Sequence, residues 1–264
     1  MNEVQDYVAD LELLQTAARK GAEIALSYFG KDPKISYKEG MSPVTEADFA
    51  VDAYLKETLR AARPDYGWLS EETADSSERL SKKRTFVVDP IDGTKAFIAG
   101  NSMWCVSVAI VENGRSIAGV LDCPVRKEIY TAALGQGAHK NGVKLERRAE
   151  NAPLVLSGTK ALLAQFAKVT GVVSHAHSHI PSLAYRIAMI ADGRLDGAFI
   201  KTNAQDWDLA AADLILAETG GAICNTDGTR AAYGKPSTAH GILVAAHTSH
   251  IDVMLGVVAT STIG

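Results

Sequence analysis

Cysteine is scarce in this chain, which carries only Cys105, Cys123 and Cys224 among its 264 residues. The three lie far apart and form no Cys-x-x-Cys pair, so the sequence predicts neither a disulfide framework nor a thiolate zinc site. An excess of positive charge is missing too, since the formal net charge is −4 and the pI is about 6.0. We therefore expect no direct binding to nucleic acid or to an anionic membrane surface.

Long apolar runs are also absent. No stretch reaches the roughly 18 consecutive apolar residues that a membrane-spanning helix needs. The segment from Met1 to Leu14 alternates acidic with apolar residues and lacks the basic start of a signal peptide. Hydrophobic residues make up 47% of the chain and charged residues 22%, as in soluble globular proteins. We expect a cytoplasmic protein with neither a membrane span nor a signal peptide.

Apolar spacing in the first half predicts two helices and then a sheet. The helices cover residues 11–29 and 45–62, the second with Thr45 as N-cap. Two Asn-Gly pairs, at 113–114 and 141–142, indicate tight turns between strands. The strands expected in this half, which form a largely antiparallel meander, are 85–88, 104–111, 116–121 and 128–133.

After about residue 150 the pattern changes to alternating short strands and helices, which is typical of an α/β arrangement. The expected strands are 154–156, 172–173, 198–200, 222–223 and 242–244, and the expected helices are 160–168, 182–191, 208–219 and 247–258. We see no internal repeat and no long linker. The sequence therefore predicts two halves, residues 1–150 and 151–264, that form one continuous globular unit.

The most informative segment places two carboxylates three residues apart at the end of an apolar strand. It reads Val87-Val88-Asp89-Pro90-Ile91-Asp92-Gly93-Thr94. Gly93 permits close approach of the backbone to a ligand, and the first N–H groups of a short helix after it would form an anion site. Carboxylates beside a phosphate site suit Mg²⁺. The alternative interpretation is an ordinary Asp-Gly turn that follows a strand.

Two further acidic segments are candidates for the same chemistry. Glu71 and Glu72 follow the apolar residues Trp68-Leu69, although an adjacent glutamate pair is also typical of a solvated surface. Asp208, in Asp206-Trp207-Asp208, precedes an Ala/Leu-rich helix, where it could be a metal ligand or an N-cap. The residues alone leave both alternatives open.

Four motifs, in this order along the chain, resemble the inositol monophosphatase superfamily. They are Val44-Thr45-Glu46-Ala47-Asp48, the pair Glu71-Glu72, Asp89-Pro90-Ile91-Asp92-Gly93-Thr94, and Trp207-Asp208-Leu209-Ala210-Ala211-Ala212 with Glu218-Thr219-Gly220-Gly221 downstream. The matches extend from about residue 38 to 221. The resemblance implies an α/β (α+β) fold, a layered αβαβα sandwich, and a metal-dependent phosphoric monoester hydrolase.

The resemblance also implies roles for individual residues. The ligands of two or three Mg²⁺ ions would be Glu71, Asp89, Asp92, Asp208 and the carbonyl oxygen of Ile91. Glu71 and Thr94 would position and deprotonate the attacking water, with Asp48 orienting the Thr94 hydroxyl. The backbone N–H groups of Gly93 and Thr94 would bind the substrate phosphate. The full set of expected substrate contacts is Asp92, Gly93, Thr94, Ser182, Lys201 and Asp208.

Lys201 departs from the pattern of inositol-hydrolysing relatives, which carry an acid seven residues before the aspartate that matches Asp208. A lysine there favours a second anionic group on the substrate, unless it is a surface lysine in a loop. Three segments also resemble the bisphosphate-nucleotidase branch: Ser42-Pro43-Val44-Thr45, Leu69-Ser70-Glu71-Glu72 and Gly93-Thr94-Lys95-Ala96-Phe97-Ile98. Arg186 could likewise face the substrate cleft or the solvent.

The histidines His175, His177 and His179 alternate along the chain, a spacing that would place three imidazoles on one strand face for Zn²⁺ or Ni²⁺. A polar loop between a strand and a helix is the other interpretation.

We expect hydrolysis of an inositol monophosphate-like polyol phosphate by metal-activated water. A 3′(2′),5′-bisphosphate nucleotide, histidinol phosphate and a non-catalytic role as a regulatory protein partner stay open as alternatives. A homodimer and sensitivity to lithium are implied by the resemblance alone.

Overall fold

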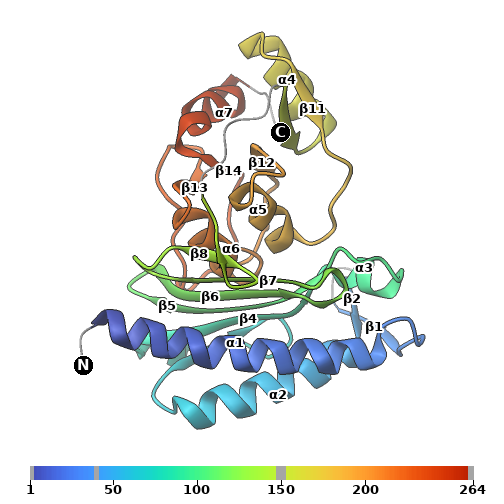
Figure 1. Cartoon of the computed structure of the whole chain (residues 1–264), viewed down its shortest axis with the longest axis vertical. Helices are drawn as coiled ribbons and strands as arrows, with labels where there is room; N and C mark the ends of the chain where they lie inside the picture. The colour runs from blue at the N-terminus through green and yellow to red at the C-terminus, as the bar shows by residue number, and fades with distance from the viewer. Residues whose placement is uncertain (1–2, 39–41, 147–152, 261–264) are drawn as a thin grey trace.

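The computed structural model describes residues 3–38, 42–146 and 153–260. Its elements lie in five layers, which Figure 1 shows from bottom to top. Two long helices lie under a seven-stranded sheet, two helices separate that sheet from a five-stranded sheet, and two more helices cover the far side. The layered αβαβα sandwich that the sequence predicted is therefore confirmed.

The lowest layer consists of α1 (Glu3–Tyr28) and α2 (Glu46–Ala62). Their apolar faces pack on the seven-stranded sheet in a core that contains Leu14, Val51 and Phe86, all fully buried. Helix α2 begins where the sequence predicted, because the Thr45 side chain accepts a hydrogen bond from the backbone at the helix start. Helix α1 starts earlier than expected and adds about two turns to the predicted element.

The seven-stranded sheet follows the order of the chain, with every neighbouring pair antiparallel except the first. Its strands are β3 (Gly67–Ser70), β4 (Arg84–Asp92), β5 (Cys105–Glu112), β6 (Arg115–Cys123), β7 (Glu128–Ala133), β8 (Ala138–Lys140) and β9 (Val143–Lys144). Both Asn-Gly pairs form the expected hairpin turns, with positive φ at each of the four residues. Two short strands, β1 (Ile35–Tyr37) and β2 (Pro43–Thr45), pair beside this sheet.

The upper layers contain the alternating elements. Helices α5 (Leu183–Ala191) and α6 (Asp206–Ala217) lie between the sheets, and α4 (Lys160–Thr170) and α7 (Thr248–Thr260) cover the outer face. The five-stranded sheet has the order β11-β10-β12-β14-β13. Its strands are β10 (Leu154–Ser157), β11 (Ser174–Ala176), β12 (Gly197–Ile200), β13 (Gly221–Asn225) and β14 (Leu243–His247). Short helical turns are α3 (Thr94–Ile98), η1 (Ser77–Ser81) and η2 (Pro124–Arg126).

Two further predicted elements differ from the structure. The strand expected at Val172-Val173 lies at Ser174–Ala176, because both valines are exposed after the Gly171 helix cap and contribute nothing to a core. The helix expected from residue 208 begins at Asp206. The predicted boundary at residue 150 falls outside the described residues, so the division into two halves stays a prediction. Within the described part of the chain, no helix combines the length and apolarity needed to cross a bilayer.

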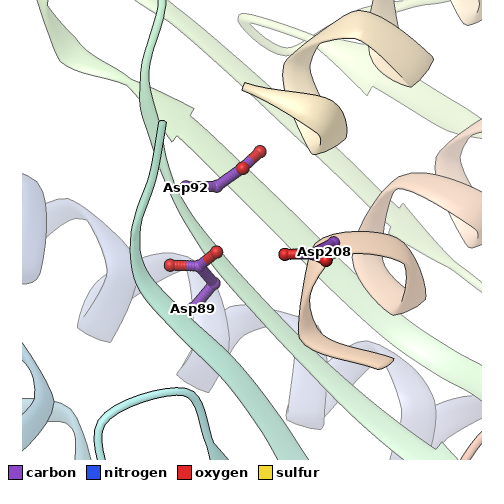
Figure 2. Close-up of side chains that lie close together, drawn as sticks. All are labelled: Asp89, Asp92 and Asp208. Atoms are coloured by element: carbon purple, nitrogen blue, oxygen red, sulfur yellow. The ribbon is translucent and has the colours of Figure 1, made fainter. Parts of the chain in front are cut away.

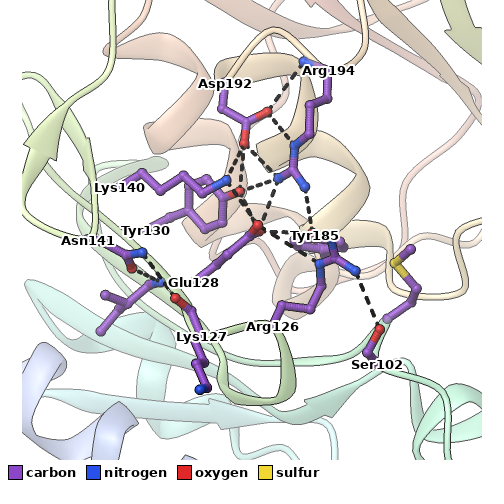
Figure 3. Close-up of polar contacts among 12 residues, drawn as sticks. Ser102, Arg126, Lys127, Glu128, Tyr130, Lys140, Asn141, Tyr185, Asp192 and Arg194 are labelled. Atoms are coloured by element: carbon purple, nitrogen blue, oxygen red, sulfur yellow. Dashed lines mark hydrogen bonds and ion pairs between the residues drawn. The ribbon is translucent and has the colours of Figure 1, made fainter.

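A polar network fastens α5 to the seven-stranded sheet (Figure 3). Arg194, just after α5, pairs with Glu128 at the start of β7 at 3.1 Å and with Asp192 at 2.6 Å. Lys140 of β8 pairs with the same two carboxylates, and the Tyr185 hydroxyl on α5 donates to Glu128 at 2.9 Å. Because every acid in this network faces two cations, it fixes the position of α5 without leaving an unpaired buried charge.

Helix α6 rests on β6 at a glycine. A Cβ atom at Gly119 would lie 3.1 Å from both the Cα and the carbonyl oxygen of Ala211, so only glycine allows this separation of helix and strand. Beside it, the Ser116 hydroxyl donates to the Ala210 carbonyl at 2.7 Å. The height of α6 above the sheet is therefore set at Gly119.

Substitution of Gly119 by valine should destabilise the protein, because α6 must move away from the sheet. We expect a loss of about 2–3 kcal/mol, or a fall in melting temperature of roughly 5–10 °C. Thermal unfolding followed by circular dichroism measures the effect. The control is Gly241→Ala, where an added Cβ meets no atom within 4 Å. Equal melting temperatures for the two variants would show that Gly119 does not set the helix position.

Candidate active site

The two aspartates at the end of β4 point to the same side of the sheet because the strand is irregular there. Asp89 is paired with Ser107 and Asp92 with Cys105. Between these two pairs β4 advances by three residues and β5 by only two, which is a β-bulge. In a regular strand, residues three apart would face opposite sides. The extra residue lies next to Pro90, which has no N–H for the ladder. The bulge thus brings both carboxylates into one space (Figure 2).

Asp208, on the first turn of α6, completes a cluster with Asp89 and Asp92. One carboxylate oxygen from each residue lies within 4.8 Å of the others. Figure 2 shows the three side chains converging from β4 and α6. Burial raises the pKa of Asp89 well above its usual range, and the nearby charges of Glu71, Asp92 and Asp208 raise it further. A divalent cation would remove this repulsion, so the donor set fits a hard metal ion.

Asp92 is held by the N-terminus of α5. Its carboxylate accepts hydrogen bonds from the Ser182 hydroxyl at 2.5 Å, from the Ala184 N–H at 2.6 Å and from the Leu183 N–H at 3.2 Å. Burial nevertheless raises the pKa of Asp92 to about 6, against the opposing effect of these hydrogen bonds. Ser182 is fully buried and is the N-cap of α5, so its hydroxyl contacts Asp92 from the protein interior.

Asp208 is both a member of the cluster and part of a helix cap. Gln205 is the N-cap of α6, and its backbone N–H donates to the Asp208 carboxylate at 2.7 Å. The interpretation of Asp208 as the N-cap itself is therefore wrong by three residues. Asp206 was not singled out from the sequence: its buried carboxylate lies 2.8 Å from His240 Nε2 and accepts the Gly234 N–H at 2.8 Å.

Thr94 and Asp48 meet beside the cluster. The Thr94 hydroxyl lies 3.3 Å from Asp48 Oδ1 and 3.1 Å from the Ile91 carbonyl oxygen. The other Asp48 oxygen accepts the Thr45 N–H at 2.8 Å and the Thr45 hydroxyl at 2.6 Å. Gly93, with φ of +97°, turns the chain from β4 into α3 and leaves no room for a side chain, since a Cβ would lie 2.9 Å from the Met103 carbonyl oxygen.

Glu71 lies next to the cluster but pairs with a lysine. Lys38 Nζ is 2.9 Å from Glu71 Oε1 and 2.6 Å from Glu72 Oε1. The Glu72 side chain is almost fully buried and that of Glu71 is 22% exposed, so the interpretation of this pair as a solvated surface is wrong. Burial raises the pKa of Glu72 to about 7, although Lys38 opposes the shift. Lys38 was missed from the sequence because more than thirty residues separate it from its partners.

Four further candidates, Lys201 and the histidines His175, His177 and His179, lie outside this cluster. Lys201 is exposed directly after β12. His175 is exposed on β11, and His177 follows it with its ring nitrogen Nδ1 2.8 Å from the Ser178 carbonyl oxygen. In the described ranges, the aspartates are the only acidic, histidine or cysteine side chains whose ligand atoms gather in this way. The arrangement of the histidines therefore favours the interpretation of a polar strand end and loop over that of a metal site.

Comparison with known proteins gives the same assignment over almost the whole chain. Residues 6–260 match the model of the inositol monophosphatase family. The chain belongs to this family. It is 32% identical over 257 residues to a Nus factor SuhB of Haemophilus influenzae, which covers 93% of this chain and 94% of the relative.

Other relatives are similar over comparable lengths. A histidinol-phosphatase of Mycobacterium tuberculosis is 32% identical, with 87% of this chain and 92% of the relative covered. The structure of an inositol monophosphatase from Thermotoga maritima superimposes with a TM-score of 0.80 at 26% identity, covering 95% of this chain and 96% of that one. Inositol monophosphatase family members are phosphatases that act on phosphate monoesters, and this chain is a phosphatase of that superfamily.

Mg²⁺ should raise the melting temperature more at about pH 8 than at about pH 5.5, because protons compete with the cation for the carboxylates. The raised pKa of Asp92, about 6, means that the folded protein binds this proton more tightly than the unfolded chain. Without the cation, the stability from that proton is lost as the pH rises through about 6. Thermal unfolding with and without Mg²⁺ at both pH values measures the difference.

Two variants control this measurement. Asp89→Asn should remove most of the Mg²⁺-dependent shift, because it deletes a central charge of the cluster. Asp65→Asn, at an exposed position remote from the cluster, should leave the shift unchanged. A shift of the same size at both pH values, or one retained in Asp89→Asn, would contradict a cation site at these aspartates.

Proposed function

We propose that this protein is a Mg²⁺-dependent phosphomonoesterase that hydrolyses a small phosphorylated metabolite with an activated water. The observation that carries the proposal is the position of the buried aspartate cluster beside the Thr94–Asp48 pair. A cluster of negative charge can attract a phosphate ester only through cations. The hydroxyl next to it supplies a group that can hold a water for attack.

The metal site would use the residues expected from the sequence: Asp89, Asp92, Asp208, Glu71 and the carbonyl oxygen of Ile91. The donor set fits Mg²⁺, which prefers carboxylate and carbonyl oxygens together with water and phosphate oxygens. When bound, Mg²⁺ neutralises phosphate charge, lowers the pKa of a coordinated water and stabilises the leaving oxygen. Two or three ions would occupy this site.

Thr94 would position the attacking water, and Asp48 would set the direction of its hydroxyl. Because a hydroxyl has one proton, donation to Asp48 Oδ1 leaves the Thr94 oxygen lone pairs free to accept a hydrogen bond from the attacking water. Asp48 is held in place because its second oxygen caps α2. Glu71, also near the cluster, would take the proton that the water loses.

The turn at Gly93 would bind the substrate phosphate. Gly93 is the N-cap of α3, has a left-handed backbone and directly follows the end of β4. The N–H groups of Gly93 and Thr94 would donate to phosphate oxygens. Asp92 and Asp208 flank this position and would reach the phosphate through the cation. Ser182 supports the site through Asp92.

Phosphate release in the presence of Mg²⁺ tests the function. The panel consists of inositol 1-phosphate, adenosine 3′,5′-bisphosphate and histidinol phosphate, which represent the substrates that stay open from the sequence. At least one should be hydrolysed, and Asp89→Asn should lower kcat by about 10³-fold or more, because several kcal/mol of charge stabilisation depend on the ion. The Asp65→Asn protein should keep full activity. Full activity in Asp89→Asn would exclude the proposed metal site.

Substitution of Thr94 separates its hydroxyl from its packing. Thr94→Ala should lower kcat by about 10²- to 10⁴-fold, in the range seen when a group that takes part in proton transfer is removed. Thr94→Ser keeps the oxygen and should stay within roughly tenfold of the natural protein. Steady-state kinetics on the best panel substrate compare the two. Equal activities would show that the hydroxyl takes no part in the reaction.

A regulatory role is a second candidate function, favoured by the relative from Haemophilus influenzae that is named Nus factor SuhB. Such a role would need a protein surface and no catalysis. The Asp89→Asn protein separates the two functions, since a purely binding role survives the substitution. The intact cluster of Asp89, Asp92 and Asp208 supports catalysis as the primary function. A homodimer, a cytoplasmic location and inhibition by lithium belong to the same proposal.

A further inference from the structure

A cavity of about 480 Å³ lies between the N-terminus of α5 and the segment that joins β12 to α6. Leu183, whose N–H donates to Asp92, lines one side of it. Ala204 lines the other side, directly before Gln205, whose N–H donates to Asp208. The cavity is therefore adjacent to the aspartate cluster and within reach of a ligand bound there.

The charge of this cavity is opposite to that of the cluster. Its lining contains Lys160, Arg186, Lys201 and the imidazole of His179, and it contains no aspartate or glutamate. The three cationic side chains come from three separate segments: the start of α4, the middle of α5 and the loop after β12. None of the three has a side-chain hydrogen bond or ion pair within the described part of the chain. The cavity thus concentrates positive charge, and the charge of Arg186 is also attracted by that of Asp92.

Arg186 is the most constrained of these side chains. It lies one turn after Ser182 on α5, so the two residues share a helix face. Its Nε atom is buried and has no hydrogen-bond partner among the described residues. The interpretation that Arg186 faces the solvent is therefore wrong for its Nε atom. A buried donor without a partner is costly, and the planar guanidinium fits a carboxylate or a phosphate with two parallel hydrogen bonds.

We infer that the substrate carries a second anionic group, a phosphate or a carboxylate, and that Arg186 binds it in this cavity while the scissile phosphate lies at the aspartate cluster. Lys160 and Lys201, both exposed, add positive charge at the cavity mouth. The inference rests on the proposed phosphatase function and narrows its substrate class. A plain polyol phosphate has no second charge to pair with the guanidinium.

Two matched substrate pairs test the inference with the natural protein and Mg²⁺. Adenosine 3′,5′-bisphosphate is compared with adenosine 3′-monophosphate, and 3-phosphoglycerate with glycerol 3-phosphate. We expect the member with the second anion to have at least about tenfold higher kcat/KM in one pair, because a site built to bind a charged group discriminates against the analogue without it. The preferred pair distinguishes a phosphate from a carboxylate. Equal kcat/KM within both pairs would overturn the inference.

Variants locate the effect at the cavity. Arg186→Gln should abolish the preference, because it lowers kcat/KM for the member with the second anion far more than for the member without it. Arg186→Lys should restore part of the preference. Lys201→Gln should reduce the preference less, and it keeps the test valid if Arg186→Gln does not fold, because Lys201 is exposed. The matched control is Lys168→Gln, on α4 but outside the lining of this cavity.

The outcomes separate this inference from the proposed function. If Arg186 only balances the charge of Asp92, Arg186→Gln lowers kcat/KM for both members of a pair alike, and the inference fails while the phosphatase function stands. If no member of either pair and no member of the earlier panel releases phosphate, the proposed function itself fails. A preference that survives both Arg186→Gln and Lys201→Gln would place the second anion elsewhere.

Discussion

Repulsion between buried carboxylates is the constraint on which the rest of this site depends. Asp89, Asp92 and Asp208 share one small space, and burial raises the pKa of each. Neighbouring carboxylates raise these pKa values further, with Glu71 acting on Asp92. No packing force would gather them, so the backbone must impose the arrangement at the cost of stability. A bound cation would offset this repulsion. The phosphatase function of the family is consistent with such a cation.

Backbone N–H groups at the N-termini of three helices hold the site carboxylates in place. Asp92 accepts two N–H groups from the first turn of α5, Asp208 accepts the Gln205 N–H in the cap of α6, and Asp48 caps α2 through Thr45. Each carboxylate therefore satisfies orphan donors of a helix and faces the site at the same time. The position of the site is coupled in this way to the packing of the helices, which the Arg194 network and the contact at Gly119 hold in place.

Sequence signals identified what is local in this structure. The Asn113-Gly114 turn, the Thr45 cap and the apolar spacing of the helices were sufficient to place those elements, because their energetics involve residues close in the chain. The aspartates were found through a motif and a family resemblance. Lys38 on Glu71 and His240 on Asp206 were not predictable, since each pair spans more than thirty residues and depends on the finished fold. Asp208 was ambiguous from the sequence for a physical reason, since it takes part in a cap and in the cluster.

The aspartate cluster is acidic and the adjacent cavity is basic, and this arrangement affects which substrates the protein can select. A site that recognises a polyol needs acceptors for hydroxyl groups, and an acid seven residues before Asp208 would be one. Here that position holds Lys201, and the described lining of the adjacent cavity has no carboxylate at all. The attraction between opposite charges weakens gradually with distance, whereas hydrogen bonds to hydroxyls need well-aligned geometry. Selection by a second charge would therefore tolerate variation in the rest of the substrate, and Arg186, held on the same helix that positions Asp92, would link recognition of that charge to the catalytic cluster.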